Sequence, residues 1–266
     1  MLTPGEFVNF YAQVGAKKCA NSTGKLFLAA VLAGFLIASG AVAAGTASYA
    51  LDNPSVARVV GGLLFPFGLI MVIITGAELF TGNCMIAISL LEKKASLAGM
   101  ARNLVIVYIG NMFGAVSLAA AMACSGTFSN GALALCVMRT AGNKCAIPFG
   151  RAVILGILCN ILVCAGVMCS LCGKSLAGRA IGAFVPVSFF VIGGFEHCVA
   201  NMYYIPAGIL AAGLPGAAQL ALEGGVELSS LNLAGFLSNL IPVTIGNIAG
   251  GCGFGALIWA TQRPEA

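Results

Sequence analysis

One stretch of this chain is too long for a single membrane-spanning helix. From Ala180 to Leu214 the sequence is predominantly apolar over 35 residues, whereas about 20 residues are enough to cross a bilayer. In its middle stands the pair Glu196-His197, which holds the only histidine of the chain. Polar side chains are tolerated at membrane depth where irregular backbone lines a cavity. The stretch is therefore predicted to form two half-helices that meet at a break.

The same pattern occurs earlier in the chain. Segment 76–83, GAELFTGN, has a glutamate two residues and an asparagine seven residues after its first glycine, and segment 194–201 repeats both spacings. Each copy is followed by a GNxxG motif, at 110–114 and at 246–250. Two motifs repeated in one order indicate a two-repeat membrane transporter with interrupted helices at corresponding positions.

Composition and hydropathy support a membrane protein. Hydrophobic residues make up 60% of the chain and charged residues 8%, and the mean hydropathy is +1.02, as in polytopic membrane proteins. We expect one all-α transmembrane domain over residues 1–266, with repeats at 26–124 and 149–260 and six spans, of which the second and fifth are broken. The predicted spans are Leu26–Ala50, Val59–Leu91, Leu104–Cys124, Phe149–Cys172, Ala180–Leu214 and Leu233–Ala260.

The basic residues predict the orientation of the spans. Nine of the 13 lysines and arginines fall on the side that carries both termini, and four, among them Arg58 and Lys144, fall on the other side. By the positive-inside rule both termini are cytoplasmic. The net charge of +5 thus reflects topology and does not indicate binding of nucleic acid.

Residues 3–20 are predicted to form an amphipathic helix on the cytoplasmic surface. Thr3-Pro4 is typical of a helix start, and Phe7, Phe10, Tyr11 and Val14 share one helical face. A membrane anchor and a gating element are both compatible with this pattern, and the anchor is the simpler interpretation.

The 11 cysteines are interpreted as small apolar residues, because most lie within predicted spans. The Cys169/Cys172 pair has no second pair or histidine to complete a zinc site, so no metal or cofactor is expected. Cys136 and Cys145 share a predicted outer loop, where they could pair.

Three ionisable residues at the breaks are candidates for function. Glu78 and Glu196 are expected to brace the loops by accepting their free backbone N–H groups. His197 is expected to line a pore, since it can exchange protons near neutral pH. The spacing alone makes Lys144 a loop residue. A membrane-embedded thiol or redox enzyme using Glu196, His197 and the cysteine pair is the alternative from another class.

Four segments together resemble the formate/nitrite transporter family. They are GAELFTGN, the GNxxGA that follows it, GFEHCVANMYYIPAG and IPVTIGN, and the resemblance extends over residues 5–260. It implies a homopentamer of six-helix protomers with an aquaporin-like fold in the inner (cytoplasmic) membrane, each protomer with its own pore. It also implies a channel for small monovalent anions, with formate favoured and hydrosulfide or nitrite as alternatives, and no enzymatic activity.

The resemblance also assigns site residues in this chain. It implies His197 as the central histidine and Thr81, Lys144, Asn160 and Asn247 as further pore or substrate-binding residues. The implied cytoplasmic constriction is Phe65, Leu69, Leu79 and Phe190, and the implied periplasmic constriction is Phe80 and Val163. On this basis we hypothesise that His197 gives a proton to the anion so that the neutral acid crosses, or only hydrogen-bonds to it.

Overall fold

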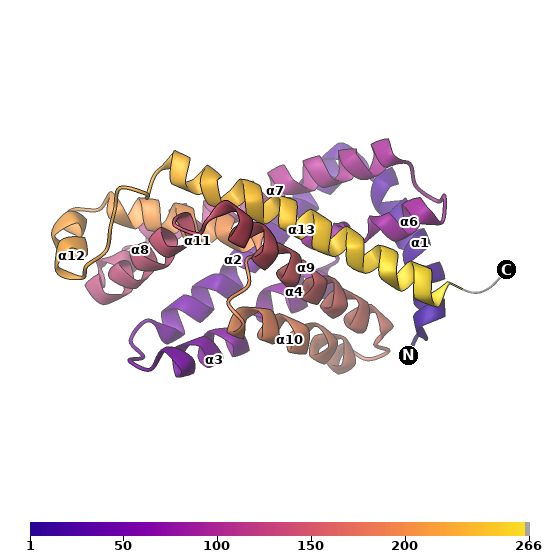
Figure 1. Cartoon of the computed structure of the whole chain (residues 1–266), viewed down its shortest axis with the longest axis horizontal. Coiled ribbons are helices and arrows are strands. Elements are labelled where there is room, and N and C mark those ends of the chain that lie inside the picture. The colour runs from indigo at the N-terminus through magenta and orange to yellow at the C-terminus, as the bar shows by residue number, and fades with distance from the viewer. Residues whose placement is uncertain (264–266) are drawn as a thin grey trace.

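The computed structural model describes residues 1–263, so the last three residues of the predicted domain lie outside it, and the described part is helical throughout (Figure 1). Its elements are α1 (Pro4–Ala20), α2 (Thr23–Ser48), α3 (Pro54–Leu64), α4 (Phe67–Thr75), α5 (Phe80–Asn83), α6 (Ile86–Leu91), α7 (Leu97–Cys124), the 3-10 turn η1 (Thr127–Ser129), α8 (Gly131–Cys145), α9 (Phe149–Cys172), α10 (Leu176–Ile192), α11 (Cys198–Ala212), α12 (Ala217–Glu223) and α13 (Leu233–Gln262).

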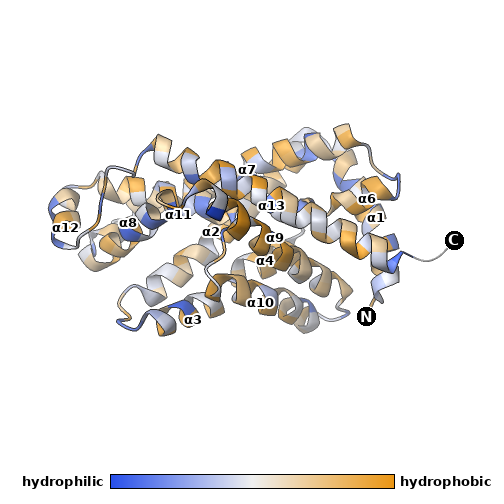
Figure 2. Ribbon diagram, in the orientation of Figure 1, coloured by the Kyte–Doolittle hydropathy of each residue, from blue (hydrophilic) through white to orange (hydrophobic). Residues whose placement is uncertain are grey.

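The predicted all-α membrane fold is confirmed. By length and apolarity, five helical segments can cross a membrane: α2, α3 with α4, α7, α9 and α13; the number rises to six if α11 and α12, bent by 105°, count as one span. The predicted fifth span is the pair α10 and α11, whose 17 and 15 residues are each short for a bilayer. Apolar residues cover much of the helices (Figure 2), as contact with lipid requires.

Both predicted breaks are present, and each begins at a glycine. Gly76 follows α4 with φ of 69°, and Gly194 follows α10 with φ of 70°. A residue other than glycine would be strained in such a left-handed backbone conformation, because of its Cβ. The chain then runs extended through Leu79 and His197 into the next helix. Equal geometry at both breaks supports the sequence-based repeat.

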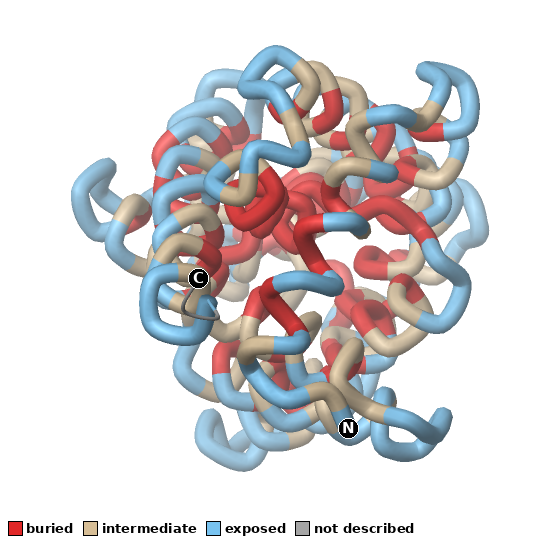
Figure 3. Tube along the Cα trace, turned by 90° about the vertical axis from the view of Figure 1, so that its right-hand side faces the viewer, coloured by how far each residue is buried: buried red, intermediate tan, exposed pale blue. Residues whose placement is uncertain are grey.

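The two ends of the molecule carry different helices (Figure 1). Both termini lie at one end, near α1 and α6, and the outer helices α8 and α12 lie at the other. The breaks lie between these ends, and buried segments gather in the interior (Figure 3). The GNxxG glycines bring spans together as expected, because Gly114 packs on α2 at Val31 and Gly250 packs on α9 at Ile157.

The N-terminal helix has its predicted extent but presents another face. Thr3 and Glu6 form a capping box. The fully buried face holds Phe7, Tyr11 and Gly15, whereas Phe10 is 40% exposed. This face packs on α6 and α13, so protein contacts and not lipid cover it.

The predicted outer loop is wrong in one part, because residues 131–145 form the helix α8. Asn130 caps the start of this helix, because its Oδ1 accepts a hydrogen bond from Leu133 N at 3.2 Å. Cys136 and Cys145 stand nine residues apart on this one helix, about 13 Å along its axis, so they cannot pair. All 11 cysteines are free thiols.

Candidate functional site

A hydrogen bond between the two breaks marks the centre of the protein. Thr81 Oγ1 and His197 Nε2 lie 2.9 Å apart, and both residues are buried. His197 also caps α11, because its Nδ1 accepts the Ala200 backbone N–H at 3.1 Å. Since Nδ1 is an acceptor, a neutral ring carries its hydrogen on Nε2 and donates it to Thr81. The structure thus brings together the two central residues that the resemblance implied.

Two asparagines do the work that the sequence assigned to the glutamates. Asn111 Oδ1 accepts the backbone N–H of Phe80 at 2.9 Å, and Asn247 Oδ1 accepts that of Cys198 at 2.9 Å. Each asparagine also donates to the carbonyl of its glutamate, Glu78 or Glu196. Short side-chain amides of the GNxxG motifs therefore satisfy the free N–H groups at both helix starts.

The glutamate carboxylates bind side chains instead. Glu78 Oε2 accepts from Lys18 Nζ at 2.7 Å and from Asn83 Nδ2 at 2.7 Å. The second break repeats both contacts, because Glu196 accepts from Lys144 Nζ at 2.8 Å and from Asn201 Nδ2 at 2.7 Å. The two ion pairs balance the charge of two buried carboxylates that would otherwise be costly. The expected backbone contact of the glutamates is wrong, and their bracing acts through these side chains.

One further asparagine completes each cluster. Asn83 donates to Asn103 Oδ1, and Asn103 donates to the backbone carbonyl of Lys18. In the other half Asn201 donates to Asn239 Oδ1, and Asn239 donates to the carbonyl of Lys144. Each lysine is thus fixed at the end of its helix, α1 or α8, beside its glutamate.

A cavity opens on each side of the central contact. The Lys144 vestibule has a volume of about 290 Å³ and includes His197, Glu196 and Arg58 in its wall. The Lys18 vestibule has about 130 Å³ and includes Leu79, Gly82 and Tyr11. The Lys144 ammonium group also lies 5.3 Å from the ring centroid of Tyr204. His197 lines the Lys144 vestibule, whereas Thr81 lines neither vestibule and stands between Leu79 and Gly82 of the Lys18 vestibule wall. A lysine therefore stands in each vestibule, and the Thr81–His197 contact joins the two walls.

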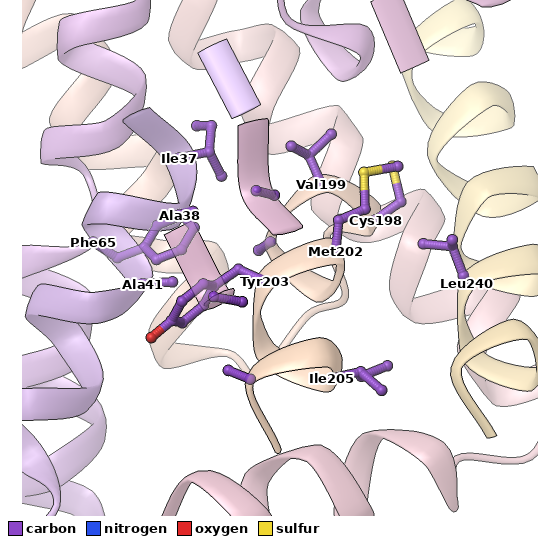
Figure 4. Close-up of a cluster of buried hydrophobic side chains, with 14 of the residues drawn as sticks. Ile37, Ala38, Ala41, Phe65, Cys198, Val199, Met202, Tyr203, Ile205 and Leu240 are labelled. Carbon is purple, nitrogen blue, oxygen red and sulfur yellow. The ribbon is translucent and has the colours of Figure 1, made fainter. Parts of the chain in front are cut away.

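The residues of the implied cytoplasmic constriction are divided between the two vestibules. Leu69 and Leu79 line the Lys18 vestibule, as implied for the cytoplasmic constriction. Phe65 and Phe190 line the Lys144 vestibule instead; their rings pack edge to face at 5.6 Å, and Phe190 stacks on His197 at 5.9 Å. Figure 4 shows Phe65 beside α2 residues of the buried cluster. When a span is apolar on all faces, its sequence does not show which vestibule a given side chain lines.

Phe80 and Val163 line neither vestibule. Both are buried, and Phe80 packs edge to face on Tyr108 at 4.8 Å. One helical turn beyond Val163, Val167 does line the Lys18 vestibule. Side chains that close a pore need not line a cavity, so the implied periplasmic constriction stays a prediction.

Asn160 and Asn247 are fully buried and also lie outside both vestibules. Asn160 Nδ2 donates to the carbonyls of Thr81 and Asn247, at 3.2 and 2.6 Å. Asn247 donates to Gly156 O at 2.8 Å and Glu196 O at 3.0 Å. These amides hold the backbone around the centre, and their implied role in the pore stays a prediction.

Sequence reasoning missed Lys18, Asn103 and Asn239. The two asparagines could have been found, because each stands eight residues before the asparagine of its GNxxG motif. Lys18 gives no such signal, since its partner Glu78 is 60 residues away. Among the described residues no three His, Cys, Asp or Glu side chains gather as a metal site would require.

Comparisons with known proteins agree with this geometry. The sequence model described as "Formate/nitrite transporter" matches residues 5–261. The formate channel FocA of Haemophilus influenzae is 37% identical over 94% of this chain and 90% of its own length. FocA of Escherichia coli K12 is 36% identical over the same shares.

Solved structures are similar along nearly the whole chain. A pentameric formate channel with formate bound has a TM-score of 0.80 and 35% identity, covering 90% of this chain and 96% of the other. An ion channel of the FNT family has a TM-score of 0.83 and 25% identity, covering 97% and 99%.

Proposed function

This chain belongs to the formate/nitrite transporter family, and from this premise we propose that it conducts formate between the Lys144 vestibule and the Lys18 vestibule. The family consists of transporters, so the protein is a multi-pass membrane channel and not a thiol or redox enzyme. One observation carries the proposal, namely the Thr81–His197 hydrogen bond that lies between two vestibules with one lysine each.

The charges in the vestibules favour a small anion. Lys144 and Lys18 offer ammonium N–H groups to a carboxylate, although Glu196 and Glu78 balance their charges. Arg58 adds to the Lys144 vestibule a cation that belongs to neither ion pair. The start of α11 at Cys198 adds the positive end of its helix dipole. Between the vestibules the walls are apolar, with Leu79 on one side and Phe190 on the other. A bare carboxylate loses its water there at a large cost.

The hydrogen bonds of His197 determine how this residue can reduce the desolvation cost of the anion. A neutral imidazole can offer its Nε2–H to the anion in exchange for Thr81, and this needs no change elsewhere. Giving up a proton entirely requires an imidazolium, in which Nδ1 also carries hydrogen and can no longer accept the Ala200 N–H. Proton transfer from His197 would therefore require the cap of α11 to open.

Replacing His197 by asparagine separates the two mechanisms. Asparagine is a good helix cap through its Oδ1, and its Nδ2 can donate toward Thr81, but it does not exchange protons. If the variant carries formate at the wild-type rate in proteoliposomes, the histidine acts only as a hydrogen-bond donor. If flux falls at least about tenfold while the protein folds normally, the anion takes its proton at this position.

The identity of the anion is tested by flux into proteoliposomes, at equal gradients of formate, nitrite and hydrosulfide and at two pH values. We expect formate to be fastest, because the relatives named as formate channels cover nearly the whole chain. Faster nitrite or hydrosulfide flux would overturn formate as the substrate and leave the family assignment intact.

We further propose that the protein is a homopentamer in the inner (cytoplasmic) membrane, with both termini in the cytoplasm. The similar solved structure of a pentameric formate channel supports the assembly, and the relative from Escherichia coli supports the location. The distribution of basic residues supports the orientation. Light scattering of the purified protein and protease protection of terminal tags in spheroplasts would each test one part.

A further inference from the structure

The short helix α5 carries Thr81, yet its own hydrogen bonds hold it weakly. It has only four residues, and Leu79 at its start provides no side-chain cap. Three neighbouring peptide groups are instead held from outside. Asn111 of α7 accepts the N–H of Phe80, and Asn160 of α9 donates to the carbonyl of Thr81. The third bond comes from α1, at the N-terminus.

That third bond joins Tyr11 to Gly82. The Tyr11 hydroxyl donates to the Gly82 carbonyl at 3.1 Å across 71 residues of sequence, and Tyr11 is only 1% exposed. The tyrosine is itself held, because Ser89 Oγ donates to its carbonyl at 3.2 Å. One turn further along α1, Gly15 lies so close to Ser89 that a Cβ would clash. The close packing of α1 on Ser89 therefore fixes the position of the Tyr11 hydroxyl at Gly82.

The bond has no counterpart in the other repeat. Aligning Glu78 with Glu196 places Ala200 where Gly82 stands, and aligning Lys18 with Lys144 places Val137 where Tyr11 stands. Valine cannot donate a hydrogen bond. At Ala200 the backbone is held by His197 Nδ1 instead. Tyr11 thus holds the backbone next to Thr81 in the first repeat, and His197 holds the backbone next to itself in the second repeat.

We infer that Tyr11 is a positioning residue for anion passage: by holding Gly82 it keeps the Thr81 hydroxyl at His197. Tyr11 and Gly82 both belong to the wall of the Lys18 vestibule, so the bond stands at the inner edge of the central contact. The inference rests on the proposed function, since it assigns Tyr11 to the same passage. It gives α1 a role beyond that of a membrane anchor.

The test compares Tyr11→Phe with Tyr203→Phe in proteoliposomes. Tyr11→Phe removes one hydroxyl and keeps the buried ring. Tyr203 is also buried, and its hydroxyl makes no hydrogen bond within residues 1–263; Figure 4 shows its position in the apolar cluster. Because a hydrogen bond of ordinary strength is lost, we expect the maximal formate flux to fall about five- to tenfold in Tyr11→Phe and to stay unchanged in Tyr203→Phe.

A second measurement separates positioning from general damage. If Thr81 is displaced, selectivity changes, so the ratio of formate to acetate flux should shift by at least about twofold in Tyr11→Phe. The oligomeric size should stay as in wild type, and the thermal midpoint should fall only by the roughly 2–4 °C that one lost hydrogen bond explains. Wild-type flux and selectivity in Tyr11→Phe would overturn the inference, as would an equal loss in Tyr203→Phe. Absence of formate flux in the wild type would overturn the proposed function instead.

Discussion

Replacing Asn247 by alanine removes three buried hydrogen bonds at once. Its Oδ1 accepts from Cys198 N at 2.9 Å, and its Nδ2 donates to Gly156 O at 2.8 Å and Glu196 O at 3.0 Å. Each such bond contributes about 1 kcal/mol net. At Cys198 the loss is instead about 1–3 kcal/mol, because its N–H would remain buried without a partner. We therefore expect Asn247→Ala to destabilise the protein by about 3–5 kcal/mol.

Thermal unfolding of the detergent-purified protein at one fixed scan rate measures this loss. For a chain of this size about 1 kcal/mol corresponds to roughly 2–4 °C in Tm, so the midpoint should fall by about 6–20 °C. Asn53→Ala is the matched control, because Asn53 caps α3 at an exposed site with two bonds to backbone N–H groups. An exposed cap of this kind contributes about 1 kcal/mol.

Two further variants test the reasoning. Asn111→Ala should cost as much as Asn247→Ala, since Asn111 makes the matching bonds to Phe80 N, Ala30 O and Glu78 O. Asn247→Asp should be no better than alanine, because its carboxylate would face two carbonyl oxygens. An Asn247→Ala midpoint equal to that of Asn53→Ala, or an aspartate variant close to wild type, would refute the account of these bonds.

Three other perturbations test the vestibules. Lys144→Ala should lower formate flux by about three- to tenfold and only slightly more at low salt than at high salt, because the Lys144 side chain is 16% exposed and a partly buried charge is screened weakly. Lys144→Arg should keep most of the flux. Cys136 lines the Lys144 vestibule, so a negatively charged methanethiosulfonate should slow formate flux in wild type but not in Cys136→Ser; because burial raises the pKa of the Cys136 thiol, the reaction should accelerate as pH rises. Cys169→Ser with Cys172→Ser should leave flux unchanged, since both thiols are free and lie in the last turn of α9, outside the vestibules.

The spans and both breaks were predictable because they depend on local sequence. Apolar length gives a span, and a glycine followed by a glutamate gives a break where the backbone must turn left-handed, as at Gly76 and Gly194. The central pair Thr81 and His197 was found through the resemblance of their motifs. Their hydrogen bond joins residues 116 positions apart, and no spacing rule predicts it.

The sequence did not predict features that depend on the depth of a side chain in the membrane or on a partner far away in the chain. Phe65 lies in the turn between α3 and α4, and Phe190 lies in α10. These spans are apolar on most faces, so periodicity could not place the two side chains in one vestibule rather than the other. The glutamates were assigned to backbone N–H groups because carboxylates accept such bonds well. The structure gives these bonds to the asparagines, whose amide can accept from one backbone group and donate to another, whereas a carboxylate can only accept.

The two repeats suggest a way to tell scaffold from working residues. Glutamate, its lysine and three asparagines recur in both halves with matching contacts, as Lys18 with Glu78 and Lys144 with Glu196 show. Residues that recur have the same structural task in both halves. At the centre the symmetry is broken, because Leu79 occupies the position of His197 and Val199 the position of Thr81. A single histidine can meet a single hydroxyl only if each repeat supplies one of them, and therefore the asymmetric positions are where substrate specificity should be sought.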